Sequence, residues 1–246
     1  MGKNMDKYIK KVDSTTYELI EDHQMLGTIS LYHNSFHNKY LYLVFSLINY
    51  PSFSPFPEIM KQENQSLQVM IDSSEKTLID FLVKNGFQLK RRCFTPEVSV
   101  NDLKYTLANK NTTHVAKFDS SNKIYRHCTE FLYQYYRNMH EKISPLTASK
   151  DRFIREVPTK TGYYQLNQSN EIENVIFAEK NEIAYICSNN KQTCRSFILT
   201  VLNDMFKHYP KIYFEADDTD WAATMLLNQF QIDQTESFNT YILEKA

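Results

Sequence analysis

The stretch that decides the fold covers residues 182–243 and reads EIAYICSNNKQTCRSFILTVLNDMFKHYPKIYFEADDTDWAATMLLNQFQIDQTESFNTYIL. Residues 183–187 are rich in β-favouring and aromatic side chains and predict a strand. The polar residues 188–193 predict a turn. Apolar residues at helical spacing then predict a helix that ends before Pro210, namely Phe197, Ile198, Val201, Leu202, Met205 and Phe206.

The same stretch continues with a second strand and a second helix. Residues 212–214 predict a buried strand, and Asp217, Asp218 and Asp220 offer N-caps and favourable helix-dipole charges for the helix that follows. That helix has an apolar stripe made of Ala223, Leu226, Leu227 and Phe230, and a last strand ends near Leu243. The order strand, helix, strand, helix, strand indicates an α/β layer.

Two short patterns in this stretch resemble the GNAT acyltransferase superfamily. The family's second signature reads Asn-x-x-Ala-x-x-Leu-Tyr-x-x-x-Gly-Phe, and its frame holds Asp220, Ala223, Leu226, Leu227, Gln231 and Ile232 here. The first signature, Arg/Gln-x-x-Gly-x-Gly/Ala at a strand-to-helix turn, has its counterpart in Lys191, Gln192, Thr193, Cys194 and Ser196, without the glycines. The resemblance is one of order and spacing, and it implies a mixed, mostly antiparallel central sheet flanked by helices, which is an α/β (α+β) fold.

The first hundred residues repeat this alternation of strands and helices. Strands are predicted at residues 16–21, 26–32, 40–48, 67–71 and 87–95, with helices at 58–65 and 75–85. Aligning residues 85–87 with residues 230–232 places Leu82 on Leu227 and Leu78 on Ala223. Internal repetition is a strong guide to architecture. We therefore expect two related halves, a shortened GNAT-like half at residues 1–100 and a complete GNAT-like domain at residues 101–246.

The remaining elements of the second half follow the family order. After a connection at residues 96–113, a strand is predicted at 114–118 and a long helix at 123–143, capped by Ser120, Ser121 or Asn122. A short helix at 151–157 and strands at 162–167 and 175–180 complete the half.

Composition restricts the class of protein. The chain has 246 residues, of which 42% are hydrophobic and 14% aromatic, which is ample for a packed core. Its formal net charge of −1 argues against a nucleic-acid partner held mainly by charge. No apolar run approaches the roughly 18 residues that a spanning helix needs, so we expect no membrane partner. With four scattered cysteines and no apolar signal core, a cytoplasmic protein with reduced thiols is expected.

The resemblance also implies a donor site. In GNAT proteins the acyl-CoA diphosphate is held by backbone N–H groups at the start of the helix that follows the fourth strand, where the helix dipole favours an anion. The matching residues are Ile186, Cys187, Lys191, Gln192, Thr193, Cys194, Arg195 and Ser196, joined by Asp220 and Ala223 of the second signature. We expect acetyl-CoA as the co-substrate and no metal. An ordinary polar helix start is the alternative for these residues. In the first half the equivalent loop contains Pro51, Pro55 and Pro57, which lack N–H donors, so no CoA is expected there.

Catalysis would require a base for the amine and a proton donor for the thiolate. Many GNAT proteins use a tyrosine of the second signature as donor, but that position is Leu227 here and Leu82 in the first half. Glu215 at the end of its strand is the candidate catalytic base, although a solvated surface carboxylate is the commoner role for glutamate. Glu179 is a second candidate base, and Tyr185 and Tyr241 are alternative hydroxyl donors.

Two functions from different classes remain open at this point. The first is an acyl-CoA-dependent N-acyltransferase, with acetyl-CoA as donor and a small-molecule or peptide amine as acceptor. The second is a binding or regulatory module on a GNAT scaffold that has lost its chemistry, because a fold does not guarantee an activity. Neither the acceptor nor the oligomeric state follows from the residues.

Overall fold

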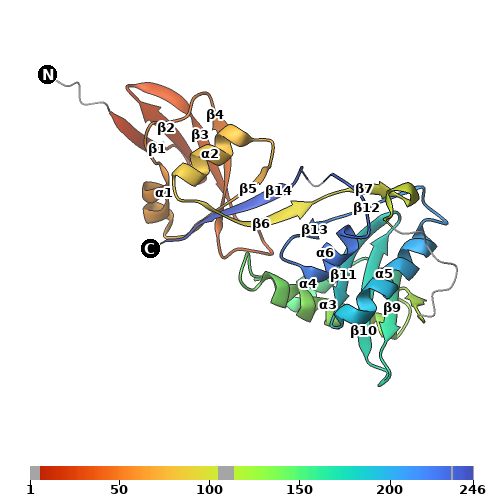
Figure 1. The fold of residues 1–246 in the computed structure, drawn as a ribbon. Helices are drawn as coiled ribbons and strands as arrows, with labels where there is room; N and C mark the ends of the chain where they lie inside the picture. The colour runs from red at the N-terminus through yellow and green to blue at the C-terminus, as the bar shows by residue number, and fades with distance from the viewer. Residues whose placement is uncertain (1–5, 105–113, 234, 246) are drawn as a thin grey trace. The chain divides into compact units, whose positions relative to one another are not determined.

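The structure is a computed structural model that describes residues 6–104, 114–233 and 235–245. The chain folds into two compact units (Figure 1). The first unit comprises Met1–Arg91, Ile143–Thr147 and Phe238–Ala246, and the second comprises Arg92–Lys142 and Ala148–Ser237. Each unit has its own hydrophobic core.

A mixed sheet forms the centre of the second unit. Its strands lie in the order β7-β12-β11-β10-β9-β8. They are β7 (Glu97–Ser99), β8 (Ala116–Phe118), β9 (Thr161–Leu166), β10 (Ile172–Glu179), β11 (Glu182–Ser188) and β12 (Lys211–Phe214). Only β11 and β12 pair in parallel, and the other neighbours are antiparallel.

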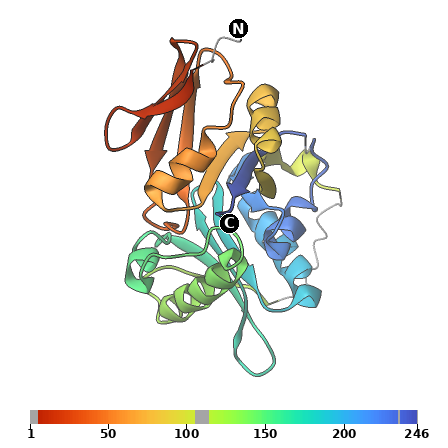
Figure 2. The same ribbon diagram turned by 90° about the vertical axis from the view of Figure 1, so that its left-hand side faces the viewer.

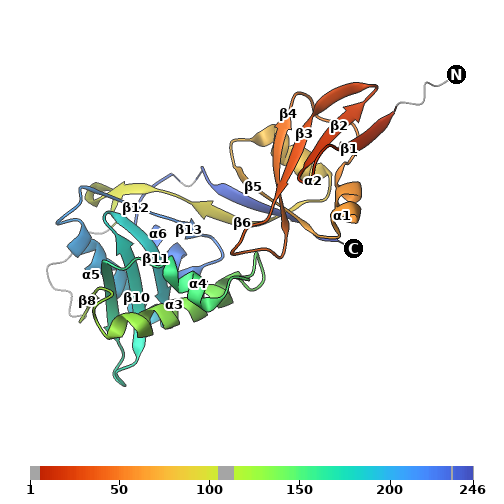
Figure 3. The same ribbon diagram turned by 180° about the vertical axis from the view of Figure 1, so that it is seen from behind.

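Helices cover both faces of this sheet, as Figures 2 and 3 show. The helices α3 (Ile124–His140) and α4 (Lys150–Arg155) lie on one face, and α5 (Lys191–Met205) and α6 (Trp221–Leu227) lie on the other. Six consecutive residues of β10, from residue 173 to 178, are buried, as expected for a strand covered on both sides. A short 3-10 helix, η1 (Val100–Asp102), follows β7.

The first unit is built on a second sheet. Its strands lie in the order β1-β2-β3-β4-β5-β14-β6. They are β1 (Lys7–Lys11), β2 (Thr16–Glu21), β3 (Gln24–Tyr32), β4 (Leu41–Leu47), β5 (Leu67–Asp72), β14 (Phe238–Leu243) and β6 (Gln88–Phe94). Two helices, α1 (Phe56–Glu63) and α2 (Lys76–Lys84), supply apolar side chains to its core. The buried Phe56 of α1 contacts the rings of Phe45, Phe81 and Phe87 and so joins both helices to the strands.

The last strand of the chain belongs to the first unit. Strand β14 pairs antiparallel with β5 over six residue pairs, from Phe238↔Asp72 to Leu243↔Leu67. Conversely, β6 leaves the first unit at Arg91, and its end pairs with β13 (Ala216–Asp217) inside the second unit. The division into GNAT-like halves at residue 100 stays a prediction. The compact units do not follow it, because Arg92 already belongs to the second unit, whereas Ile143–Thr147 and the C-terminal strand belong to the first.

The fold class predicted from the sequence is confirmed, with mixed sheets flanked by helices. Three short strands were not predicted, namely β1, β7 and β13. The turn predicted at residues 188–193 is wrong in extent, because Asn190 is the N-cap of α5 and the helix already begins at Lys191. The cap predicted for α3 at Ser120, Ser121 or Asn122 is also wrong, since the N-cap residue is Lys123, without a side-chain cap bond. Part of the predicted connection, residues 105–113, lies outside the described residues.

Candidate functional site

The two parallel strands of the second unit separate soon after they begin. They pair only at Glu182↔Tyr213 and Ile183↔Phe214, whereas β11 continues to Ser188. Among the described strands, residues 185–188 pair with β10 alone. One main-chain edge of β11 is therefore left without a strand partner at its carboxyl end, and α5 begins just beyond that end.

The start of α5 carries most of the predicted donor-site residues. The side chain of Asn190 caps the helix by accepting from the Gln192 N–H at 2.9 Å. Lys191 and Gln192 are exposed, so positive charge and polar groups surround the first turn. The positive end of the α5 dipole thus faces the end of β11, an arrangement that favours an anion.

The remaining predicted residues of α5 lie deeper or further along the helix. Cys194 is fully buried, and burial raises the pKa of its thiol to about 11. Ser196 lies in the second turn, where its hydroxyl donates to the Thr193 carbonyl at 2.8 Å. Arg195 is exposed, and its Nε donates to the Gln229 side chain at 3.3 Å. These three residues therefore frame the helix start without belonging to its first turn.

Ile186 and Cys187 are buried on β11. Burial raises the pKa of the Cys187 thiol well above its ordinary value, with smaller contributions from Cys128, Asp220 and Cys194. A thiol in this environment stays protonated and is a poor nucleophile. These residues support the sheet beside the helix start.

Asp220 has a structural role at the start of α6. Its carboxylate accepts from the Ala222 and Ala223 N–H groups at 2.9 and 3.3 Å, as the sequence predicted for an N-cap. It also accepts from the Tyr135 hydroxyl of α3 at 2.5 Å. Burial is the main cause that raises the pKa of Asp220. Ala223 is itself buried.

The two helix starts lie close together. The Lys191 ammonium lies 5.3 Å from the centre of the Trp221 ring, at the first residue of α6. A cation over an indole face is attracted by the ring quadrupole. The predicted residues from the two signatures thus come to one end of the sheet.

The candidate base Glu215 lies directly after β12 and is exposed. Tyr185 of β11 lies within electrostatic range of it. Burial raises the pKa of the Tyr185 hydroxyl first, and the carboxylates of Glu215, Glu156 and Glu182 raise it further. The hydroxyl is therefore fully protonated at neutral pH and can donate a proton.

An aromatic cluster surrounds Tyr185 on the α3 face of the sheet. Its ring centre lies 6.3 Å from that of Tyr136 and 6.1 Å from that of Phe153. His140 stacks on Tyr136 with centroids 3.9 Å apart, and its Nε2 lies 3.8 Å from an Asp217 oxygen. The sequence marked Tyr185 as a candidate hydroxyl donor and Asp217 as an N-cap, but nothing in it pointed to Phe153 or His140.

The first unit lacks the corresponding features at its own helix. Its parallel strands β4 and β5 also pair over only two residues, Leu41↔Leu67 and Tyr42↔Gln68. However, α1 begins after Pro55 without a side-chain cap bond, and Pro57 occupies its first turn. Prolines supply no N–H donors to an anion. The positions of the family tyrosine, Leu82 and Leu227, are buried core residues in the two units.

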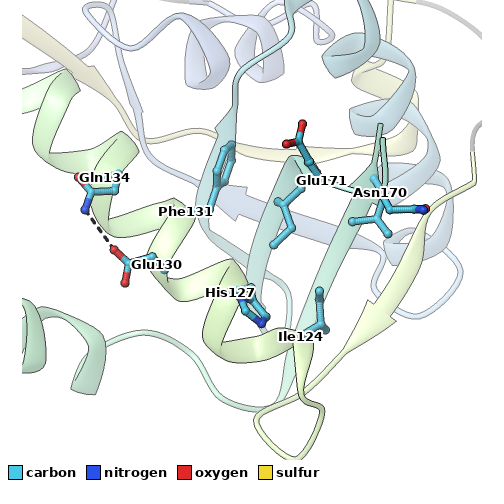
Figure 4. A pocket seen from close by; sticks show the side chains of 9 residues that line it. Ile124, His127, Glu130, Phe131, Gln134, Asn170 and Glu171 are labelled. Carbon is cyan, nitrogen blue, oxygen red and sulfur yellow. Dashed lines mark hydrogen bonds between the residues drawn. The ribbon is translucent and has the colours of Figure 1, made fainter. Parts of the chain in front are cut away.

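An open groove of about 610 Å³ lies between α3 and the β9–β10 hairpin of the second unit (Figure 4). Its apolar lining comes from Ile124, Phe131, Leu166 and Ile172. The polar lining consists of His127, Glu130, Gln134, Asn170 and Glu171. Glu130 is engaged already, because it accepts from Gln134 at 3.1 Å and pairs with Lys150.

The described residues contain neither a metal-ion cluster nor a membrane-spanning helix. No group of three or more His, Cys, Asp or Glu side chains in that part of the chain is arranged to hold a metal ion. Within the same residues, no helix is long and apolar enough to cross a membrane.

Comparison with solved structures identifies the fold. A GCN5-related N-acetyltransferase from Sphaerobacter thermophilus superposes with a TM-score of 0.51 at 7% sequence identity, over 96% of this chain and 82% of the other. A tandem GNAT protein from the clavulanic acid biosynthesis pathway gives a TM-score of 0.48 at 4% identity, over 93% of this chain and 82% of the other. No family model and no curated protein matches the sequence. The likeness to the Sphaerobacter thermophilus structure shows that the protein has the GNAT fold, as the two signatures suggested.

Proposed function

We propose that the protein is an acyl-CoA-dependent N-acyltransferase whose donor site lies in the second unit. The observation that supports this most strongly is the early separation of β11 from β12 next to the start of α5. An unpaired strand edge offers main-chain hydrogen bonds to the amide groups of a pantetheine arm. The adjacent helix start, with Lys191 and Arg195 beside it, offers N–H groups and positive charge to the diphosphate.

The reaction requires the acceptor amine to lose a proton and attack the thioester carbonyl. The carbon–sulfur bond then breaks, and the departing thiolate takes up a proton. In this proposal Glu215 accepts the amine proton, directly or through water, and Tyr185 donates a proton to the thiolate. The raised pKa of Tyr185 suits the second role, because the hydroxyl keeps its proton until a stronger base forms next to it.

Several assignments belong to this proposal and rest on the fold neighbours only by analogy. The donor is acetyl-CoA, the acceptor is an amine on a small molecule or a peptide, and the protein acts in the cytoplasm. The alternative function is a GNAT-fold binding module without turnover. The burial of Leu227, where the family tyrosine would stand, favours that alternative.

Calorimetry with acetyl-CoA and a transfer assay over a panel of amines test the proposal. We expect saturable binding of acetyl-CoA and release of free CoA thiol with at least one amine. Binding without release over the whole panel would favour the binding module. Absence of binding at millimolar acetyl-CoA would remove both the donor site and the activity.

A further inference from the structure

A carboxylate of the protein occupies the start of α5. Glu173, near the beginning of β10, is only 7% exposed. One of its oxygens accepts from Asn190 Nδ2 at 2.8 Å, and the other accepts from the Thr193 hydroxyl at 2.7 Å. Both partners belong to the N-cap and first turn of α5. An acidic side chain of the protein thus lies against the helix end whose dipole favours an anion, bonded to side chains of that end.

A β-bulge in β10 sets the direction of the Glu173 side chain. The pairing of β10 with β9 changes register between Ile172 and Asn174, so that Glu173 is the extra residue. In a regular strand two successive side chains point to opposite faces. Here both Glu173 and Asn174 reach the same Thr193 hydroxyl, with Asn174 Nδ2 at 3.0 Å. Bulges are commonly found next to functional sites, where they redirect a side chain.

The cluster around Glu173 is not fully satisfied. Asn174 is completely buried, and its Nδ2 donates to both Gln165 and Thr193. Its Oδ1 is buried and has no hydrogen-bond partner among the described residues. An unpaired buried carbonyl costs free energy. The side chain of Asn174 beside Glu173 is therefore held through its Nδ2 alone.

We propose that Glu173 is a specificity-determining residue, an internal competitor that weakens binding of the CoA diphosphate at the start of α5. This inference rests on the proposed donor site. A diphosphate and a buried carboxylate cannot occupy one helix start together, because like charges repel strongly where water is excluded. CoA must therefore displace Glu173 from Asn190 and Thr193. A thioester donor without a diphosphate leaves Glu173 in place.

Glu173→Gln tests this directly, because glutamine keeps the size of the side chain and removes its charge. We expect Glu173→Gln to bind CoA at least about tenfold more tightly than the unmodified protein, from the loss of a buried like charge. Affinity for pantetheine, which has no phosphate, should not change. Isothermal titration calorimetry with CoA and with pantetheine gives both numbers.

Glu171→Gln is the matched control. Glu171 lies on the same hairpin two residues earlier and is exposed, so its replacement removes one negative charge without emptying the helix start. Asn190→Ser is a second variant, for use if Glu173→Gln does not fold. Serine is a good N-cap but lacks the amide that donates to Glu173, so CoA affinity should again increase. Thermal unfolding establishes that each variant is folded.

The results separate the inference from the proposed function. Equal CoA affinity in the unmodified protein and Glu173→Gln overturns the role of Glu173 and leaves the donor site standing. Equal gains for CoA and pantetheine also overturn it, because they indicate a general loosening of the site. If no variant binds CoA, the donor site itself is refuted and the inference falls with it.

Discussion

At the scale of single residues, Tyr185 and Glu215 are the pair on which catalysis would depend. Tyr185 lies at the point where β11 leaves β12, and Glu215 follows the end of β12. Tyr185→Phe keeps the ring in its aromatic cluster and removes only the hydroxyl. We expect kcat for amine acetylation to fall by about 10²–10⁴-fold, the usual contribution of a proton-transferring side chain.

The pH profile of kcat distinguishes this role from a structural one. Burial and three carboxylates raise the pKa of the Tyr185 hydroxyl above its ordinary value of 10.0. The activity of the unmodified protein should therefore persist to higher pH than ionisation of an ordinary tyrosine would allow. A fall in acetyl-CoA affinity with unchanged kcat in Tyr185→Phe would contradict the assignment.

Also at the scale of single residues, the raised pKa of Asp220 predicts how the stability of the protein depends on pH. Because burial raises its pKa in the folded state, the folded protein holds this proton to higher pH than the unfolded chain does. Ionisation of Asp220 thus lowers the free energy of unfolding as pH rises through the folded-state pKa. Asp220→Asn keeps a good N-cap and an acceptor for the Tyr135 hydroxyl.

We therefore expect the stability of Asp220→Asn, relative to that of the unmodified protein, to be higher at about pH 7.5 than at about pH 4, by the linkage between protonation and folding. Urea unfolding at the two pH values measures the change. Asp218→Asn is the control, since Asp218 is an exposed carboxylate in the same loop. An equal stability difference at both pH values would show that the charge of Asp220 is irrelevant.

At the scale of elements, the start of α5 has a side-chain cap bond, whereas the start of α1 has none. Gln192 is at the second helical position of α5, and its N–H bonds to the Asn190 cap. Gln192→Glu places a carboxylate where the diphosphate would bind. The helix dipole stabilises a negative charge at this position by roughly 0.3–1 kcal/mol, so the variant should stay folded. The same charge should repel the diphosphate.

We expect Gln192→Glu to weaken acetyl-CoA binding by at least about tenfold, which corresponds to about 1.4 kcal/mol. Ser54→Glu, at an exposed position before Pro55 and α1, should leave the affinity unchanged. Calorimetry on both variants gives the comparison, with circular dichroism as the test of folding. If Ser54→Glu is the variant that weakens binding, the donor site lies in the first unit instead.

At the scale of the whole molecule, strand β14 follows the second unit in sequence but belongs to the first unit. Strand β5 pairs with β4 at only two positions but with β14 at six. The pairing that closes the first sheet therefore depends on residues that follow the second unit in sequence. The first unit cannot complete its sheet until residues 238–243 have been made.

A chain that ends at Ser237 tests this dependence. We expect the backbone amides of β5 to lose most of their protection against hydrogen exchange, because the six-residue ladder to β14 is gone. The amides of β10 and β11 should stay protected, since their partners remain. A chain that ends at Glu244 keeps β14 and serves as the control. Unchanged protection of β5 in the chain that ends at Ser237 would contradict the pairing.

Much of the fold was determined by sequence alone, because the information is local. Apolar residues at helical spacing located α5, and Asp220 marked the start of α6 by its capping chemistry. The fold class followed from the order of these elements. By contrast, β7 and β13 have three and two residues, too few for any periodicity to identify.

Tertiary structure alone decided which strands meet and which charges face the candidate site. The sequence placed residues 238–243 at the end of the second half, but pairing is a long-range property, and β14 completes the other unit. The sequence also indicated a polar helix start, within residues 192–196. Only the bulge in β10, a matter of register between strands, brings the carboxylate of Glu173 to that helix start. Local patterns specify elements, whereas long-range pairing and register specify what those elements bring together.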